Sequence, residues 1–456
     1  MSGRALAILA VLCAMAVTAW LAVRVPGAPD AGAMERRSLF AADEVPLDRV
    51  NRVRVERGAA PAVEYRRTDA GWSQSEPFPH PADAAALRGV IDAFAALAVT
   101  REVDPSAIDP EARAALGIDP PQARITVSWP GGERIVELGR RTVAGRAWAR
   151  VAGAPRAASV DASLHAMVVD DDPRQWRSMR LHEPASGADV ARIEVRYGAT
   201  DAQRLVVERE GGAWRIRSPF ATRADPDAVR GYLDAILRAE ADAIVADRAD
   251  LPEAFGLAPA ERGVSLVAAD GAPLGTVDVG SPVAAGAPER FGRVDGRPTV
   301  VQLGPKAIAA LLPPPAFFVD PRGAAAVPAD VRRIELRAAG GAPGDAPALV
   351  LERTLDRWSA SVDGGSPVPA DRDRVRRLLA QLCEARAPAI AFQRAPEALV
   401  RGEFTLFGAG DAVLARIRVA REEAGQWALD GDDGVLRVHP AGFDVATDPR
   451  AYLGTR

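Results

Sequence analysis

The chain has 456 residues, which is too long for one ordinary domain, and 48% of them are apolar, which is enough for sizeable cores. Its 57 basic and 61 acidic residues are interspersed and give a net charge of −4, so there is no basic stripe for nucleic acid. The two cysteines, Cys13 and Cys383, exclude a disulfide framework and a cysteine-based zinc cluster.

An apolar run near the N-terminus predicts a membrane anchor. Residues 5–23 carry no charge and lie between Arg4 and Arg24. A helix of this length spans roughly 28 Å, about the thickness of a bilayer core. We expect residues 1–25 to form one uncleaved transmembrane anchor, residues 26–45 a linker, and the rest to lie outside the cytoplasm. The alternative is a cleaved signal with its site at residues 31–33.

The tryptophans reveal a threefold internal repeat. Trp72, Trp214 and Trp358 are separated by 142 and 144 residues. Two strand-like runs of alternating apolar and polar residues precede each tryptophan, and a proline-containing turn follows it. Each turn ends in an aspartate that we expect to cap a helix. These aspartates are Asp83, Asp225 and Asp371.

The segment after each aspartate carries one apolar stripe, repeated in phase. The stripe occupies the fourth, seventh, eighth, eleventh and twelfth positions, which is helical spacing. Its members are Leu87, Val90, Ile91, Phe94 and Ala95 in the first copy, Val229, Tyr232, Leu233, Ile236 and Leu237 in the second, and Val375, Leu378, Leu379, Leu382 and Cys383 in the third. We therefore expect Cys383 to be a core residue and not a reactive thiol.

Each copy continues with a hairpin, a strand containing an aromatic residue, a last strand and a short helix. A Gly-Leu or Gly-Ile turn precedes the hairpin in two copies and is missing from the third. The sequence Asp-Pro-Arg then closes each copy, at residues 172–174, 320–322 and 448–450, as an expected structural end-cap. The prediction is an α+β fold of three tandem repeats, each an antiparallel sheet plus a helix, over residues 46–183, 184–323 and 324–456, the last one degenerate.

Six arginines recur at fixed places in the repeats and are the candidate contacts for a partner. Three lie at the fifth position after the capping aspartate, and three end the Asp-Pro-Arg motifs. They are Arg88, Arg230 and Arg376, and Arg174, Arg322 and Arg450. The alternative is structural, because an arginine stem can cover the edge of a core and its head can pair with a nearby carboxylate.

The sequence offers no catalytic, cofactor-binding or metal-ligating residues. Its four histidines match no zinc-binding pattern, and we expect them at the surface. They are His80, His165, His182 and His439. The acidic clusters at residues 170–172 and 430–433 lack the spacing of a calcium loop, so we expect solvated turns.

The order of these elements resembles a family of membrane-anchored, extracytoplasmic bacterial proteins known as domain of unknown function 4340. The residues that carry the resemblance are Trp72, 117–120, 138–139 and 172–174, then Trp214, 256–259, 279–280 and 320–322. The resemblance covers residues 46–323 closely and 324–456 loosely. It implies a place in the bacterial inner membrane, near an ABC-type permease or a gliding-motility-like auxiliary membrane protein, and it assigns no catalytic residue.

We expect a non-enzymatic accessory or scaffold protein. It would be a single-pass protein of the inner membrane, held there by residues 5–23, with its bulk in the periplasm and a transporter permease or auxiliary subunit as partner. A cell-wall or polysaccharide-binding protein is the alternative, although the repeated tryptophans fall in strands and are expected to support the cores. A hydrolase with an unrecognised site is the third hypothesis.

Overall fold

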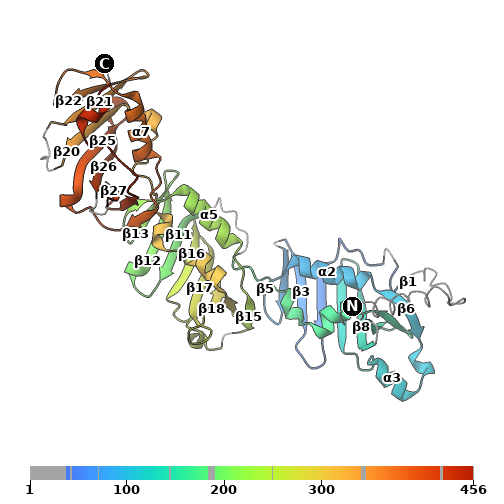
Figure 1. Cartoon of the computed structure of the whole chain (residues 1–456). Coiled ribbons are helices and arrows are strands. Elements are labelled where there is room, and N and C mark those ends of the chain that lie inside the picture. The colour runs from blue at the N-terminus through green and yellow to red at the C-terminus, as the bar shows by residue number, and fades with distance from the viewer. Residues whose placement is uncertain are drawn as a thin grey trace, which may run out of the picture. The chain divides into compact units, whose positions relative to one another are not determined.

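The computed structural model describes residues 37–41, 44–69, 71–142, 145–182, 190–248, 250–339, 346–421 and 425–454. The predicted anchor and residues 26–36 of the predicted linker lie outside these ranges. The chain forms two compact units, Met1–Ser178 and Met179–Arg456. Within the described ranges, no helix has the length and apolar character needed to cross a membrane. The fold is α+β, with antiparallel sheets and a few helices (Figure 1).

The first unit holds one sheet of ten strands, as counted over its described residues. The strand order is β1-β6-β10-β9-β8-β7-β2-β3-β4-β5. The strands are β1 (Arg37–Ser38), β2 (Arg52–Glu56), β3 (Val63–Thr68), β4 (Gly71–Glu76), β5 (His80–Pro81), β6 (Ala98–Val103), β7 (Ala123–Trp129), β8 (Gly132–Thr142), β9 (Arg146–Val151) and β10 (Ala157–Asp161). The α-helices are α2 (Ala84–Ala95), α3 (Pro110–Leu116) and α4 (Ser163–His165).

The second unit holds two sheets, each with nine strands among the described residues. The first of them contains β11 (Val190–Tyr197), β12 (Arg204–Glu210), β13 (Ala213–Ser218), β14 (Thr222–Arg223), β15 (Ala243–Ala246), β16 (Arg262–Ala268), β17 (Pro273–Pro282), β18 (Arg290–Val294) and β19 (Val300–Leu303), with helices α5 (Pro226–Leu237) and α6 (Pro305–Leu311). The other contains β20 (Arg333–Ala338), β21 (Leu349–Thr354), β22 (Arg357–Val362), β23 (Val368–Pro369), β24 (Ala389–Ala391), β25 (Val400–Phe407), β26 (Val413–Arg421), β27 (Trp427–Gly431) and β28 (Leu436–His439), with helix α7 (Arg372–Cys383).

The three sheets share one strand order. The second runs β14-β13-β12-β11-β16-β17-β18-β19-β15, and the third runs β23-β22-β21-β20-β25-β26-β27-β28-β24. Read from its β5 edge, the first sheet follows the same path and ends with the extra strand β1. In each case the strands before the long helix form one half of the sheet, and the hairpins after it form the other. We call these three bodies repeats 1, 2 and 3; the boundaries expected near residues 183 and 323 stay predictions.

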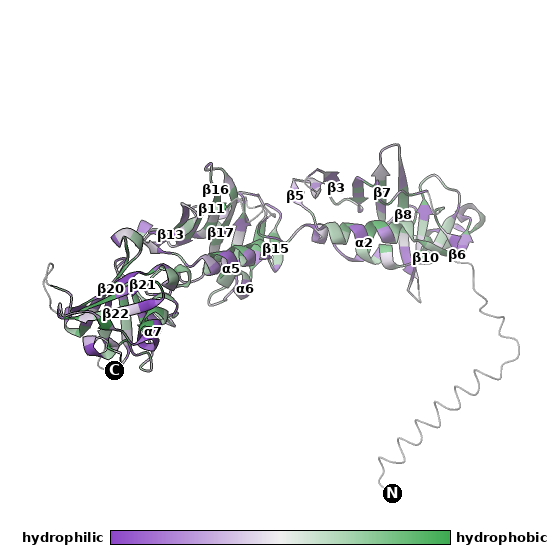
Figure 2. Cartoon of the chain, turned by 90° about the horizontal axis from the view of Figure 1, so that it is seen from above, coloured by the Kyte–Doolittle hydropathy of each residue, from purple (hydrophilic) through white to green (hydrophobic). Residues whose placement is uncertain are grey.

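The long helices α2, α5 and α7 form where the apolar stripes predict them. Each begins after the expected aspartate: Asp83, Asp225 and Asp371 each accept hydrogen bonds from amides of the first turn. The stripe faces the sheet, and Figure 2 shows green apolar and purple polar residues alternating along each helix. The prediction for Cys383 is confirmed, since the residue is 2% exposed within the core of repeat 3.

A short 3₁₀ turn is hydrogen-bonded to the capping aspartate at the start of each long helix. The amides of Asp83, Asp225 and Asp371 donate to the carbonyls of Trp176, Phe318 and Tyr452. These aromatic residues end the 3₁₀ turns η3 (Pro173–Trp176), η6 (Pro315–Phe318) and η10 (Pro449–Tyr452). The Asp-Pro-Arg motifs at 172–174 and 448–450 begin such turns, with the aspartate capping the arginine amide as expected.

The Asp-Pro-Arg motif of repeat 2 is not their counterpart. The residues equivalent to 172–174 are 314–316, so the motif at 320–322 lies six positions later, beyond η6. The identical Asp-Pro-Arg sequences predicted the same role in all three repeats. The backbone hydrogen bonds show that the motif at 320–322 lies at a different structural position. It lies in the segment that leads from repeat 2 into repeat 3.

A short extended segment closes one sheet edge in every repeat. It lies beside the chain that leaves the long helix, in the same antiparallel position each time. In repeat 1 the segment is β1, and in repeats 2 and 3 it is the chain that precedes the repeat. The paired residues are Ser38 with Ala98, Arg180 with Glu240, and Arg322 with Arg386. Since this edge would otherwise expose unpaired backbone groups, each repeat starts by covering it.

Two glycines of the hairpin explain a paired loss in repeat 3. A Cβ at Gly139 would lie 2.3 Å from the carbonyl oxygen of Leu116, and one at Gly280 would lie 2.1 Å from that of Phe255. These carbonyls belong to the turns that the Gly-Ile and Gly-Leu pairs form. Repeat 3 lacks the turn, and the equivalent strand position holds Arg421. The glycine is therefore needed only where the turn packs against it, and repeat 3 has neither the turn nor the glycine.

Replacing Gly280 with alanine is expected to lower the free energy of unfolding by about 1–3 kcal/mol, because a backbone carbonyl must move to admit the methyl group. The matched control is Gly231→Ala on α5, where an added Cβ meets nothing within 4 Å. The control should be neutral or stabilising by about 0.5–1 kcal/mol through helix propensity. Urea unfolding of both variants measures the difference, and equal effects would contradict the proposed clash.

Candidate functional site

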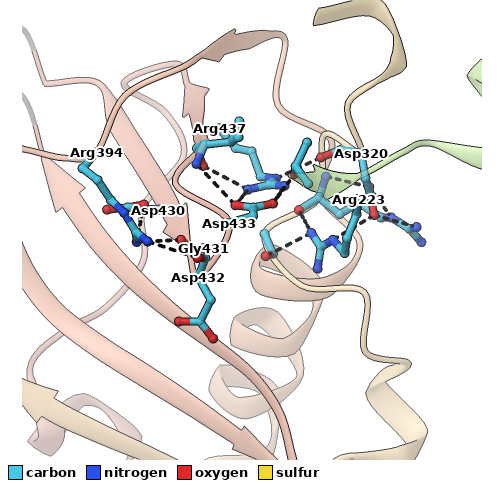
Figure 3. A network of polar contacts seen from close by, with 12 residues as sticks. Arg223, Asp320, Arg394, Asp430, Gly431, Asp432, Asp433 and Arg437 are labelled. Atoms are coloured by element: carbon cyan, nitrogen blue, oxygen red, sulfur yellow. Dashed lines mark hydrogen bonds and ion pairs between the residues drawn. The ribbon is translucent and has the colours of Figure 1, made fainter. Parts of the chain in front are cut away.

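A cluster of buried charges joins repeats 2 and 3 inside the second unit (Figure 3). Arg437 on β28 is fully buried, and its guanidinium donates to both carboxylate oxygens of Asp433, at 3.0 and 2.7 Å. Its Nε donates at 2.9 Å to the carbonyl oxygen of Asp320, which lies in the segment between the repeats. The hydroxyl of Thr222 on β14 donates to Asp433. One guanidinium thus ties repeat 3 to the chain of repeat 2.

A second arginine approaches the same segment from repeat 2. Arg223 on β14 donates to the carbonyl oxygens of Arg322 and Gly323, at 2.6 and 3.3 Å. Its Nε lies 3.5 Å from Asp320, whose carboxylate also accepts from Arg322 at 2.9 and 3.1 Å. Asp320 is 2% exposed, so its charge is balanced by arginines and not by water.

Backbone and apolar contacts complete the contact between the repeats. The amide of Ala387 donates to the carbonyl of Pro321 at 3.1 Å. Arg386 pairs with Asp225, the residue that caps α5. The rings of Phe220 and Phe392 lie 4.2 Å apart. Val435, from repeat 3, belongs to the core cluster of repeat 2. We call this set of contacts the joint.

The acidic cluster at residues 430–433 forms a turn in which Asp432 is exposed, but Asp430 is buried and Asp433 half-buried, so the expectation of a solvated turn is wrong for these two. Asp430 is 1% exposed; its carboxylate receives Arg394 at 3.3 Å and the amide of Ala395 at 3.2 Å. Arg394 also donates to the carbonyls of Gly431 and Asp432, both at 3.0 Å. Spacing alone could not reveal this arrangement, because the partners come from a distant loop and from the neighbouring repeat.

The electrostatics of the joint fit structural ion pairs. Burial acts to raise the pKa of Asp433, but the hydrogen bonds and charge of Arg437, with Thr222 and Arg223, outweigh it and lower the pKa. Burial also lowers the pKa of Arg223, with Arg437 nearby adding repulsion. Burial raises the pKa of Asp430. Arg437 thus favours the charged form of Asp433, whereas burial disfavours the charged forms of Arg223 and Asp430. The hydrogen bonds and ion pairs of the joint hold the two repeats together.

The six candidate arginines occupy three kinds of position. Arg88, Arg230 and Arg376 are exposed on their helices, and each pairs with an aspartate of its own helix, at 3.6, 3.0 and 2.9 Å. Arg174 and Arg450 lie in the η3 and η10 turns, where Asp172 and Asp448 cap their amides. Arg322 belongs to the joint. The three helix arginines therefore share an exposed position on their helices. Arg322 does not share the position of Arg174 and Arg450, because it lies in the joint.

The family model for "Domain of unknown function (DUF4340)" matches residues 72–213 and 214–391, well over half of the chain. The chain belongs to this family. Comparison with curated proteins gave no match, and neither did comparison with solved structures. The two DUF4340 matches start at Trp72 and Trp214, so each runs from the middle of one sheet into the next. The first match ends just before Trp214, whereas the second extends beyond Trp358 to residue 391.

The four histidines of this DUF4340 protein are buried, so the expectation of surface histidines is wrong. Their exposed fractions are 2–3%. His165 contacts the side chain of Gln122 and the carbonyl of Gly139 at 3.1 and 2.9 Å, and His439 stacks on Phe443 at 3.8 Å. Turns and strand ends look polar in sequence, but here they fold back against the sheets. Among the described residues, no group of three or more potential ligands could hold a metal ion.

The sequence also concealed the residues that matter most in the joint. Arg437 lies between Leu436 and Val438, so its strand shows the alternation of a half-exposed strand. The one usable signal was a local pair, Asp433 and Arg437, four residues apart. A second missed regularity is an arginine directly opposite each repeated tryptophan across a hairpin. The pairs are Arg67–Trp72, Arg209–Trp214 and Arg353–Trp358.

Proposed function

We propose that this protein is a non-enzymatic, inner-membrane-anchored scaffold or accessory subunit that presents its repeats to a protein partner outside the cytoplasm. The observation that carries the proposal is the joint. Its buried arginines and aspartates pair with one another and couple two repeats into one unit. An active site keeps reactive groups available to substrate, whereas these groups hold the chain together. Several similar bodies on one chain raise the effective concentration of binding surfaces.

The apolar run at residues 5–23 supports the membrane placement through its length. Outside the anchor, the exposed arginines Arg88, Arg230 and Arg376 recur on the outer face of each long helix. A repeated exposed cation suits contact with a protein better than it suits catalysis. The family resemblance favours an ABC-type permease, or an auxiliary subunit beside it, as the partner.

In-cell crosslinking, followed by mass spectrometry of membrane-extracted complexes, tests the proposal. We expect crosslinks from the repeats to an integral membrane permease or auxiliary subunit. The joint variant Arg437→Met, which separates the repeats, should reduce these crosslinks, while the helix control Gly231→Ala should preserve them. Recovery of the chain attached only to wall polymer would instead support a polysaccharide-binding protein. A turnover lost on substitution of one carboxylate would overturn the non-enzymatic assignment.

A further inference from the structure

Helix α7 of repeat 3 differs from α2 and α5 in the charge of its exposed face. It carries four arginines against one aspartate, Asp373, whereas α2 has one of each and α5 has one arginine and two aspartates. All four arginines are exposed. They are Arg372, Arg374, Arg376 and Arg377. Cations in the first turn oppose the helix dipole, so Arg372 and Arg374 do not serve helix stability.

A groove of about 380 Å³ lies beside this face. Trp358 and Leu379 contribute its apolar wall, and Arg372 and Arg376 reach it from α7. Arg353 adds a third guanidinium, fixed by hydrogen bonds to the carbonyls of Ala329 and Leu355 at 3.1 and 3.2 Å. The site therefore combines a half-buried aromatic ring with a row of cations, which suits a ligand that is both apolar and anionic.

The turn next to the groove carries an exposed apolar residue in a strained conformation. Leu355 is 86% exposed and has a φ of +57°. The equivalent residue of repeat 2 is Gly211, with a φ of +56°. A leucine in this region costs about 1–2 kcal/mol that glycine avoids. Val327, beside the groove residue Pro328, is also 57% exposed. Neither exposed side chain helps the fold, which points to a contact surface.

We propose that the α7 face and its groove bind an acidic segment of a partner protein, and this inference rests on the proposed scaffold function. Carboxylates of the segment pair with the α7 arginines, and an apolar side chain packs between Leu355 and Trp358. The concave groove favours a peptide over a flat lipid surface. Asp356 and Glu384 also line the groove, and Asp356 pairs with Arg353 at 3.7 Å, so the carboxylates of the segment pair with the arginines of α7.

The test uses the full chain in nanodiscs of zwitterionic lipid. A random peptide library is panned on it, and an enriched peptide is synthesised with a fluorophore for anisotropy. We expect enrichment of sequences that combine Asp or Glu with a large apolar residue, and affinity that falls as salt rises. The double variant Arg372→Glu/Arg376→Glu, which reverses the two α7 arginines that line the groove, should weaken binding by about tenfold or more. No enrichment of acidic peptides would overturn the proposal.

Two matched variants separate binding from folding. Leu355→Gly restores the residue of repeat 2 and relieves backbone strain, so its expected loss of affinity, about threefold or more, cannot come from unfolding. Arg416→Glu, an exposed site on β26 of the same sheet, should leave affinity within about twofold. Equal losses in Arg416→Glu and in the α7 variant would contradict a specific site.

Two further outcomes distinguish this inference from the function on which it rests. If the chain binds vesicles containing phosphatidylglycerol through the α7 arginines and binds no acidic peptide, the face is a membrane contact and the inference fails. If in-cell crosslinks to a membrane partner persist undiminished in Arg372→Glu/Arg376→Glu, the scaffold function stands and the α7 assignment falls. If peptide binding depends on α7 but no membrane partner is found in cells, the peptide-binding site is supported and the proposed scaffold function is contradicted.

Discussion

Replacing Arg437 with methionine is expected to lower the free energy of unfolding of the second unit by about 3–5 kcal/mol. The guanidinium is fully buried and makes hydrogen bonds to Asp433, to Val435 and to the carbonyl of Asp320. Methionine fills much of the same volume but removes the donor of two backbone carbonyls, those of Asp320 and Val435, and leaves the Asp433 carboxylate with the Thr222 hydroxyl and without its arginine. The loss should appear first as separation of repeats 2 and 3.

Hydrogen exchange measures this separation directly. The amide of Ala387, which donates to the carbonyl of Pro321 in the segment between the repeats, should exchange faster in the variant. Arg230→Met is the matched control: its exposed ion pair with Asp227 should contribute less than about 0.5 kcal/mol. Adding Asp433→Leu to Arg437→Met should recover part of the loss, because no uncompensated charge remains. Unchanged protection of Ala387 in Arg437→Met would show that the joint does not depend on the guanidinium.

The second unit is expected to lose stability as the pH falls from about 6.5 to about 4. Burial lowers the pKa of His182 and of His439 from the ordinary value of 6.5 to about 4. Within this window the unfolded chain binds protons that the folded chain cannot, so each histidine removes up to about 3 kcal/mol. Neither ring nitrogen of His182 has a hydrogen-bond partner among the described residues. Burial lowers the pKa of His182, Asp295 raises it by less, and Arg297 lowers it further.

Urea unfolding at several pH values, followed by tryptophan fluorescence, checks the histidine effect. The variant His182→Gln/His439→Gln should show a flatter profile between about pH 6.5 and 4 than the parent chain, with both referred to their stability near pH 8. Asp433 acts in a separate window: its lowered pKa stabilises the fold above the ordinary aspartate range, and this contribution is lost as the pH falls below about 4. Parallel profiles for variant and parent would contradict the buried-neutral state of the histidines.

Periodic features of the repeats could be predicted from sequence, and contacts between the repeats could not. The capping aspartates and the apolar stripes depend on spacing within one helix, so Asp83, Asp225 and Asp371 were placed correctly. The role of Arg437 depends on the approach of a neighbouring repeat, for which a strand pattern holds no information. The Asp-Pro-Arg at 320–322 shows the opposite failure, because identical letters concealed different structural positions.

The groove beside α7 could be predicted only in part from the sequence, for a similar reason. The fifth helix position marked Arg88, Arg230 and Arg376 as equivalent residues, and all three are exposed on their helices. Their role as contacts for a partner stays a prediction. That position did not reveal that Arg372 and Arg376 of α7 lie beside a groove, since the groove is also lined by Trp358 and by residues from several other elements. Leu355 in turn follows no periodicity, and only its backbone conformation makes it unusual.

The edge-closing segments have a consequence for how such chains change length during evolution. Because β1 and the two linking segments pair with their sheets at equivalent positions, the upstream end of every copy is interchangeable. Recombination between these points would delete or insert a whole copy without leaving an open strand edge. The number of copies could therefore change in whole-copy steps at these edges, whereas the joint between repeats 2 and 3 would still require its matching buried charges.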